Sequence, residues 1–185
     1  MVQTIHNIVC FHFHCPDGEL SAAIFDRQLV TSNNTLYVPW LHEEKEKNMQ
    51  KVKDNLNSDI SIINKPYIYF LDYCPDFDFV MEIINFSQKI IILDHHKSAC
   101  KEFASLLENY NDENKSKIEF IFDNKKSGCM LTWDYFYKNI SYPKSLEYIG
   151  KRDLWIWDDP NIEPFTSGYH LYCNIRNDLE FEERL

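Results

Sequence analysis

The sequence predicts an α/β fold in which an open parallel sheet of about five strands carries helices on both faces. Five short runs are rich in apolar, β-branched and aromatic residues, and segments with a helical pattern alternate with them. These runs are apolar enough to be buried on both faces, which is typical of parallel strands. No repeat or linker divides the 185 residues, so we expect a single domain over residues 1–185.

The first half of the chain sets this alternation. Three apolar runs are predicted strands: "TIHNIVCFHF" (4–13), "TLYVPW" (35–40) and "PYIYFLDY" (66–73). Between the first two, "GELSAAIFDRQLV" (18–30) is predicted to form a helix that opens after Gly18. Residues 41–56 are polar with paired charges and are predicted to be a helix or a loop.

The second half continues the pattern around "KIIILD", the strongest predicted strand. In order, the elements are a helix at 76–87, a strand at 89–94, a helix at 98–110, a loop at 112–116, a strand at 118–122, and helices at 127–140 and 143–157. Asp76 and Ser98 are the expected N-caps of their helices. Pro143 suits the first turn of the last helix.

Composition limits the partners and the compartment. A net charge of −10 repels the phosphates of long duplexes, so we expect no long duplex nucleic acid, although a local basic patch at Lys125–Lys126 or Lys151–Arg152 remains compatible. The six cysteines form no C-x-x-C pair, which argues against a zinc finger and favours reduced thiols. No leader or apolar run of ~20 residues is evident, so we expect no membrane association and a cytoplasmic protein.

Carboxylates and imidazoles follow three of the predicted strands and the last helix. They are His12, His14, Asp17, Asp72, Asp94, His95, His96 and Asp153. The carboxyl ends of parallel strands meet at one edge of an open sheet. Acidic groups gathered there repel one another unless a cation neutralises them. Mixed Asp and His ligands suit manganese, iron or zinc, and suit magnesium less well.

Four segments resemble, in order, the motifs of the DHH phosphoesterase superfamily. They are "FHFHCPDGELSAA" (11–23), "FLDY" (70–73), "LDHHK" (93–97) and "IGKRDLWIW" (149–157). The resemblance covers most of the chain and implies a DHH-type phosphoesterase domain, a metal-dependent hydrolase. It further implies hydrolysis of a phosphodiester or phosphoanhydride bond in a small substrate, such as a short oligonucleotide in an exonuclease-like reaction, a cyclic dinucleotide or a polyphosphate. Manganese is the favoured cofactor, with magnesium, zinc and iron as alternatives.

The resemblance also implies a role for each matching residue. Asp72 matches the aspartate that bridges two metal ions, and His95 and Asp153 match further metal ligands. Asp94 matches the residue that orients its neighbours. His96 matches the histidine that faces the substrate phosphate, where it would bind an oxygen or protonate the leaving group.

The first motif departs from the commonest forms of the family. The variant F/Y-H-x-x-C-x-D-G fits the chain directly and makes His12 and Asp17 the expected ligands, with His14 in reserve. Another alignment makes Glu19 the second carboxylate. Cys15 either packs in the core or replaces an aspartate ligand, which would shift the preference toward zinc or iron.

Three further expectations remain open from sequence. Cys15 and Cys74 are either both near the metals, because their strands would be neighbours, or both packed thiols that point away. Ser127 and Gly128 are either a phosphate-contacting loop or only a helix start. Five aromatic side chains are expected in the core rather than on a base-stacking surface: Trp133, Tyr135, Phe136, Trp155 and Trp157.

The region after the fourth motif raises the main alternative to catalysis. Catalytic members of the superfamily usually carry a second lobe, and only some two dozen residues follow Asp159 here. We therefore expect an open cleft in which substrate selectivity is either weak or supplied by a second copy in a homodimer or by a partner protein. The alternative is a non-catalytic DHH-like binding or scaffold module, and a weaker third interpretation is a structural α/β domain that binds metal adventitiously.

Overall fold

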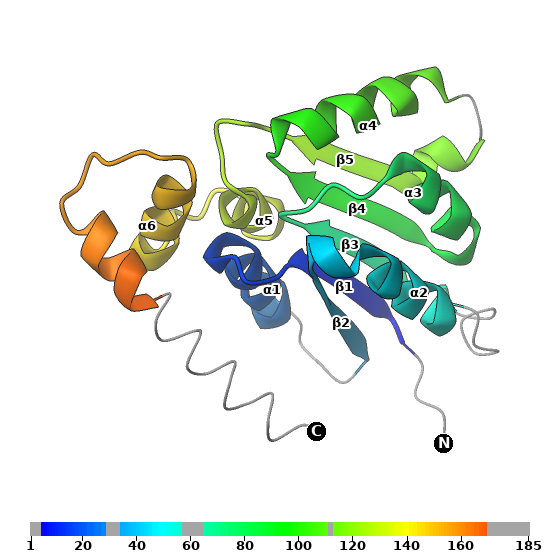
Figure 1. The fold of residues 1–185 in the computed structure, drawn as a ribbon, viewed down its shortest axis with the longest axis horizontal. Coiled ribbons are helices and arrows are strands. Elements are labelled where there is room, and N and C mark those ends of the chain that lie inside the picture. The colour runs from blue at the N-terminus through cyan, green and yellow to red at the C-terminus, as the bar shows by residue number, and fades with distance from the viewer. Residues whose placement is uncertain (1–4, 29–33, 57–64, 111–112, 170–185) are drawn as a thin grey trace.

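The computed structural model describes residues 5–28, 34–56, 65–110 and 113–169, and it contains one sheet of five parallel strands (Figure 1). The strand order is β2-β1-β3-β4-β5. The strands are β1 (Asn7–His12), β2 (Thr35–Trp40), β3 (Tyr67–Leu71), β4 (Lys89–Asp94) and β5 (Ile118–Phe122). The predicted α/β class and the parallel sheet are therefore confirmed.

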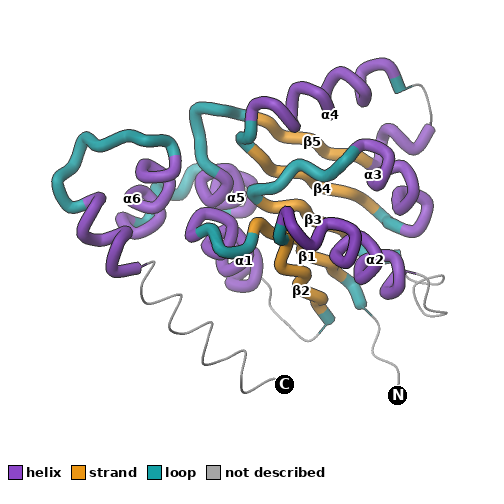
Figure 2. Tube along the Cα trace, viewed as in Figure 1, coloured by secondary structure: helices purple, strands orange, loops and turns teal. Residues whose placement is uncertain are grey.

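Helices cover both faces of this sheet (Figure 2). The elements on one face are α2 (Lys45–Leu56), α3 (Phe77–Ile83) and α4 (Lys97–Asn109), and those on the other are α1 (Pro16–Gln28) and α5 (Gly128–Phe136). The helix α6 (Lys144–Asp153) packs against α1 and α5 instead of the sheet. Short 3₁₀ helices occur at His42–Glu44, Ile84–Phe86 and Glu113–Lys117. Among the described residues, no helix has the length and apolarity needed to cross a membrane.

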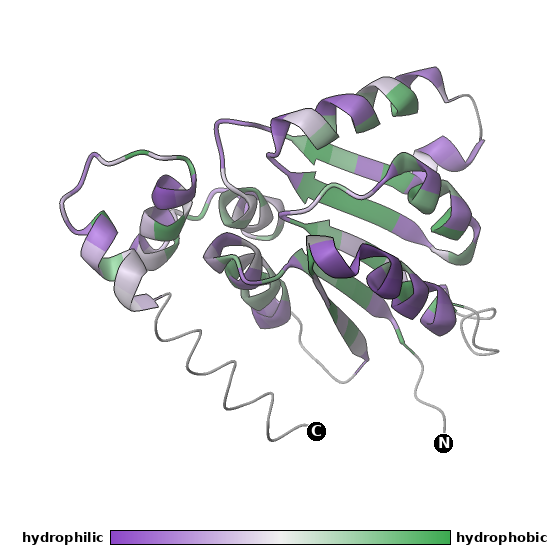
Figure 3. Ribbon diagram, in the orientation of Figure 1, coloured by the Kyte–Doolittle hydropathy of each residue, from purple (hydrophilic) through white to green (hydrophobic). Residues whose placement is uncertain are grey.

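Alternation along the strands fills the core on both faces. Ile8 and Cys10 of β1 point to the face covered by α2, α3 and α4, whereas Val9 packs under α1 with Phe25. The central strands are mostly hydrophobic (Figure 3), and their buried residues are divided between the clusters on the two faces of the sheet. Burying each such branched side chain contributes about 1.5–3 kcal/mol. A third cluster joins α1, α5 and α6 around Met130 and Ile149, so α6 is held firmly beside the sheet.

The strand order creates a switch point at β1. The chain leaves β1 through α1 on one face to reach β2, and it returns from β2 through α2 on the other face to reach β3. Ligand sites of open α/β sheets lie at such a point, beyond the carboxyl ends of the strands. His12, at the end of β1, and Asp72, directly after β3, lie here.

Several element boundaries differ from the prediction. Ser98 is not an N-cap, because α4 begins at Lys97 and His96 occupies that position. Asp76 is the N-cap residue of α3, but its side chain makes no capping hydrogen bond. The helices α5 and α6 end earlier than expected, and a 3₁₀ helix replaces most of the loop at 112–116. Five residues of the predicted elements and of the cysteine set lie outside the described residues: Thr4, Leu29, Val30, Asp112 and Cys173.

Candidate metal centre

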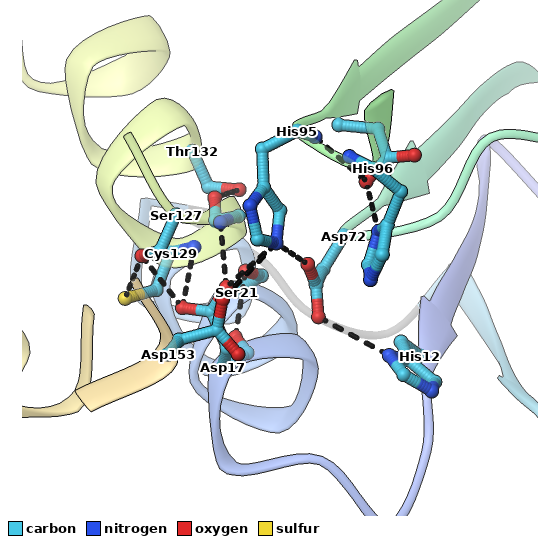
Figure 4. Close-up of polar contacts among 12 residues, drawn as sticks. His12, Asp17, Ser21, Asp72, His95, His96, Ser127, Cys129, Thr132 and Asp153 are labelled. Carbon is cyan, nitrogen blue, oxygen red and sulfur yellow. Dashed lines mark hydrogen bonds and ion pairs between the residues drawn. The ribbon is translucent and has the colours of Figure 1, made fainter. Parts of the chain in front are cut away.

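Asp72 lies at the centre of the site. Its backbone has a φ of 55°, and its N–H donates to the carbonyl of Leu93 at 2.9 Å. The side chain is 1% exposed. One oxygen, Oδ1, lies 3.2 Å from His95 Nε2, and the other, Oδ2, lies 3.4 Å from His12 Nδ1 (Figure 4). The left-handed backbone thus presents one carboxylate to two imidazoles on opposite sides.

The first half of the site is formed by the end of β1 and the loop into α1. The ligand-type atoms of His12, Cys15 and Asp72 all lie within 4.8 Å of one another. Gly18 lets the start of α1 pack closely against the end of β1, because a Cβ at that position would lie 2.1 Å from the carbonyl oxygen of His12. This half therefore offers an imidazole nitrogen, a thiol sulfur and a carboxylate oxygen.

The second half joins α1, the end of β4 and the end of α6. His95 Nε2 lies 3.2 Å from Asp153 Oδ2 and 3.9 Å from Asp17 Oδ2. The ligand-type atoms of these three residues lie within 4.8 Å of one another. Because His95 also contacts Asp72, this half brings one imidazole against three carboxylates.

The start of α5 holds Asp17 in place. The carboxylate accepts hydrogen bonds from Ser127 Oγ at 2.8 Å, from the Gly128 N–H at 2.5 Å and from the Cys129 N–H at 3.0 Å. A helix N-terminus favours a negative charge and leaves such N–H groups in need of acceptors. Ser127 is fully buried, so its observed role is to position Asp17. A direct contact between Ser127 or Gly128 and a substrate phosphate stays a prediction.

Asp94 holds His95 and His96 in place in a similar way. Its buried carboxylate accepts from the backbone N–H of His95 at 2.8 Å and from the thiol of Cys100 at 3.3 Å, and it contacts His96 Nδ1 at 2.7 Å. The hydrogen bond from Asp94 raises the pKa of His96 to about 9. The His96 side chain is 45% exposed. This imidazole is therefore charged at neutral pH, fixed at one nitrogen and accessible to solvent.

The electrostatics of the centre are those of crowded acids. Burial, followed by the charges of Asp72 and Asp153, raises the pKa of Asp17 to about 8. Burial and Asp72 likewise raise the pKa of Asp153. Burial opposes ionisation of Asp72 too, but the contacts from His12 and His95 outweigh it and hold its pKa at about 2. A neighbouring cation would relieve the repulsion that raises the pKa of Asp17 and of Asp153.

Unsatisfied buried atoms show that these residues fit a metal ion. Within the described part of the chain, both oxygens of Asp72 and Nε2 of His95 are buried and have no hydrogen-bond partner. Buried polar atoms in folded proteins are nearly always paired, and a group of unpaired ones is typical of a site that binds an ion. Carboxylate, imidazole and thiol donors together suit a divalent transition metal.

The remaining predicted residues lie at different distances from this centre. Among the described residues, His14 and Glu19 belong to neither half, and His14 is exposed on a backbone with a φ of 59°. Cys74 does not join Cys15 but forms a separate buried group with Asp94 and Cys100. His14, the reserve ligand, and Glu19, the second carboxylate of the alternative alignment, therefore lie outside both groups of ligand atoms.

The prediction of a core position is wrong for two of the five aromatic residues. Trp133 is in the core, 8% exposed, and Tyr135 and Phe136 are partly buried, as expected. Trp155 is 80% exposed and Trp157 is 48% exposed. The physical reason is that α6 ends at Asp153, two residues before the first indole, so neither indole is carried on the helix face that packs on the core.

Comparisons with known proteins add a relative and a fold but no activity. No family model matches the chain. An uncharacterized protein of Acanthamoeba polyphaga mimivirus is 30% identical over 173 residues, which cover 89% of this chain and 37% of that protein. A crystal structure of an uncharacterized protein from Helicobacter pylori G27 matches with a TM-score of 0.53 at 14% identity, over 82% of this chain and 43% of that one. The chain thus spans little more than a third of the curated relative.

Proposed function

We propose that the protein is a divalent-metal-dependent phosphoesterase that hydrolyses a phosphodiester or phosphoanhydride bond in a small phosphorylated substrate. Manganese is the cofactor that the resemblance to the DHH motifs favours. The observation that carries the proposal is the Asp72 carboxylate, buried without a hydrogen bond between His12 and His95. A single carboxylate with a free oxygen toward each side is what two adjacent cations need as a shared ligand.

Two positions for the cations follow from the groups of ligand atoms. Asp17, His95 and Asp153 would hold one together with Asp72, and His12 and Cys15 would hold the other with the same aspartate. The order of these residues along the chain agrees with the resemblance to the DHH motifs. When bound, the cations would act as Lewis acids that neutralise negative charge on the phosphate oxygens and on the oxygen of the attacking water.

The chain's own residues would bind and orient the substrate. His96 is charged at neutral pH because of Asp94, and its ring is exposed beside Asp72 and His95. It would donate a hydrogen bond to a phosphate oxygen or a proton to the leaving oxygen. Asp94 would act as a positioning residue, since its oxygens are already committed to His95, His96 and Cys100.

The test combines metal binding with turnover. Metal-stripped protein is titrated with Mn²⁺ by calorimetry and then assayed with bis-p-nitrophenyl phosphate, pyrophosphate and a dinucleotide. Wild type should bind manganese and turn over at least one of these substrates. Asp72→Asn should lose most of the affinity and the turnover, because it removes one ligand charge from both positions. Asp78→Asn, an exposed carboxylate in the first turn of α3, is the matched control and should change neither.

Two outcomes would oppose the proposal. Equal manganese affinity in wild type and Asp72→Asn would remove Asp72 as the shared ligand. Manganese binding that depends on Asp72 without turnover of any phosphoester would favour the non-catalytic module.

A further inference from the structure

A pocket opens directly beside the metal centre. It has a volume of about 410 Å³ and lies between the start of α1 and the end of α6. Its wall includes Asp17 and Asp153, which also belong to the candidate metal centre, together with Arg152, Trp155 and Trp157. A ligand with its phosphate at the metal centre would therefore extend into this pocket, whose size is typical of small-molecule sites.

Two exposed indoles make the pocket unusual. Trp155 is 80% exposed and Trp157 is 48% exposed, and their ring centroids lie 6.2 Å apart at an interplanar angle of 73°. Tryptophan is highly buried on average in folded proteins. Exposed apolar side chains that gather at one place mark binding sites.

The backbone at Trp155 gives a second, independent indication. The Ile156 N–H donates to the carbonyl of Lys151 at 2.8 Å, and the Trp155 N–H donates to that of Arg152 at 3.0 Å. This pattern ends α6 in a Schellman motif and forces Trp155 into the left-handed region, with a φ of 57°. Glycine is the usual residue at that position, because a Cβ is strained there.

Within the described residues, burial of the Trp155 indole does not compensate for this backbone strain. With most of its surface in solvent, it gains little from burial. A bulky residue in the left-handed region, mostly exposed and at the rim of a pocket, is the pattern expected of a ligand contact.

We propose that this pocket binds a nucleobase, so that the substrate is a nucleotide or the terminal nucleotide of a short single-stranded oligonucleotide. The inference rests on the proposed function for the position of the phosphate. Bases stack on aromatic side chains whatever their sequence, because every base has a π-face. Arg152 also lines the pocket, and its guanidinium would pair there with a phosphate oxygen. An inorganic polyphosphate has no ring to use the indoles.

Binding of three related ligands tests the inference. Manganese-loaded protein is titrated by calorimetry with AMP, ribose 5-phosphate and adenosine. AMP should bind about 10-fold or more tightly than ribose 5-phosphate, because only AMP adds base stacking. Adenosine should bind weakly and without manganese dependence, since it lacks the phosphate.

Trp155→Gly is the decisive variant because strain and recognition predict opposite effects. Removing the strained side chain should raise Tm by about 2–4 °C. The same change should bring the affinity for AMP down to that for ribose 5-phosphate. Asn139→Gly is the matched control: Asn139 is exposed, has a φ of 66° and does not line the pocket. It should change Tm less, because asparagine tolerates the left-handed region better than tryptophan does, and it should leave AMP binding unchanged.

The outcomes separate this inference from the proposed function. If both phosphates bind equally with manganese, or if Trp155→Gly keeps the AMP preference, the base pocket is wrong and the metal centre stands. If adenosine binding depends on Trp155 but no phosphate responds to manganese, the metal centre is wrong and the base pocket stands. If Trp155→Gly instead dissociates a dimer in sedimentation and leaves AMP binding unchanged, the indoles contact a second copy and the inference is overturned.

Discussion

Asp72 directly follows β3 and Asp94 is the last residue of the neighbouring strand β4, yet their surroundings differ. The Asp94 carboxylate accepts from His95, His96 and Cys100, so ligating a metal would break existing hydrogen bonds. The Asp72 oxygens make no hydrogen bond among the described residues and face two imidazoles instead. At the scale of single residues, hydrogen-bond satisfaction therefore separates the aspartate that orients its neighbours from the one that we propose as a metal ligand.

The same reasoning predicts that His96→Ala keeps the metal and loses turnover. His96 binds Asp94 through Nδ1 and leaves its ring exposed, so the substitution removes a proton donor without removing a ligand of either position. Turnover should fall by about 10²–10⁴-fold. Steady-state assays with calorimetry of Mn²⁺ on the same preparation measure both effects.

His14→Ala provides the matched control, because His14 is an exposed histidine near the first half of the site. It should change neither turnover nor manganese affinity. Loss of manganese in His96→Ala would mean that the two histidines of the third motif exchange roles.

The position of Cys15 leads us to expect a preference for zinc over manganese. Its thiol shares a 4.8 Å group with His12 and Asp72, and without a cation, burial and Asp72 raise its pKa. A thiolate ligand favours zinc over manganese relative to a carboxylate. Cys15→Asp should therefore shift the ratio of Kd values toward manganese by at least 10-fold, measured by competition between Zn²⁺ and Mn²⁺. An unchanged ratio in Cys15→Asp and Cys15→Ser would show that the sulfur is only packed.

At the scale of elements, the start of α5 packs against Asp72 and fixes the position of its carboxylate. A Cβ at Gly128 would lie 2.4 Å from Asp72 Cβ and 2.5 Å from its Oδ1. Gly128→Ala should therefore displace Asp72, destabilise the protein by about 1–3 kcal/mol and weaken manganese binding. Chemical denaturation with and without Mn²⁺ measures both consequences.

Gly168→Ala is the control for that substitution. Gly168 lies in the helical residues 162–169, and a Cβ there would meet nothing within 4 Å. The change should stabilise the protein by about 1 kcal/mol through helix propensity and leave manganese binding unaltered. If Gly128→Ala behaves in the same way, the contact between α5 and Asp72 does not position the carboxylate.

Sequence patterns predicted the elements and the strand-end residues but not the supports between them. Asp72 and His95 were predictable because polar residues directly after buried strands must lie at one edge of a parallel sheet. The bond from Ser127 to Asp17 spans 110 residues, so no local pattern announces it. Trp155 was misplaced because helix ends are usually marked by glycine, and here a tryptophan takes that position.

At the scale of the whole molecule, the parallel sheet concentrates negative charge at its switch point in a chain whose net charge is already −10. Metal binding should therefore stabilise the fold as well as the site. A cation present at 100 times its Kd adds about 2.7 kcal/mol to the free energy of unfolding, which raises Tm by roughly 5–11 °C for a domain of this size. Differential scanning calorimetry with Mn²⁺ and with EDTA measures this shift.

The control for that shift is Asp72→Asn, which should show little difference between Mn²⁺ and EDTA. Without metal, the free energy of unfolding of this variant should be at most about 1–3 kcal/mol below that of wild type. That loss is the effect of weakening the contacts of residue 72 with its two neighbouring imidazoles. A manganese-induced shift that survives in Asp72→Asn would place the stabilising ion elsewhere on the acidic surface.

The shared role of Asp72 is tested most directly by anomalous diffraction at the manganese edge from crystals grown with Mn²⁺. We predict two peaks that flank the Asp72 carboxylate, one against His12 and Cys15 and one against Asp17, His95 and Asp153. A map with no peak beside Asp72, or with manganese bound only by residues outside these two groups, would contradict the account.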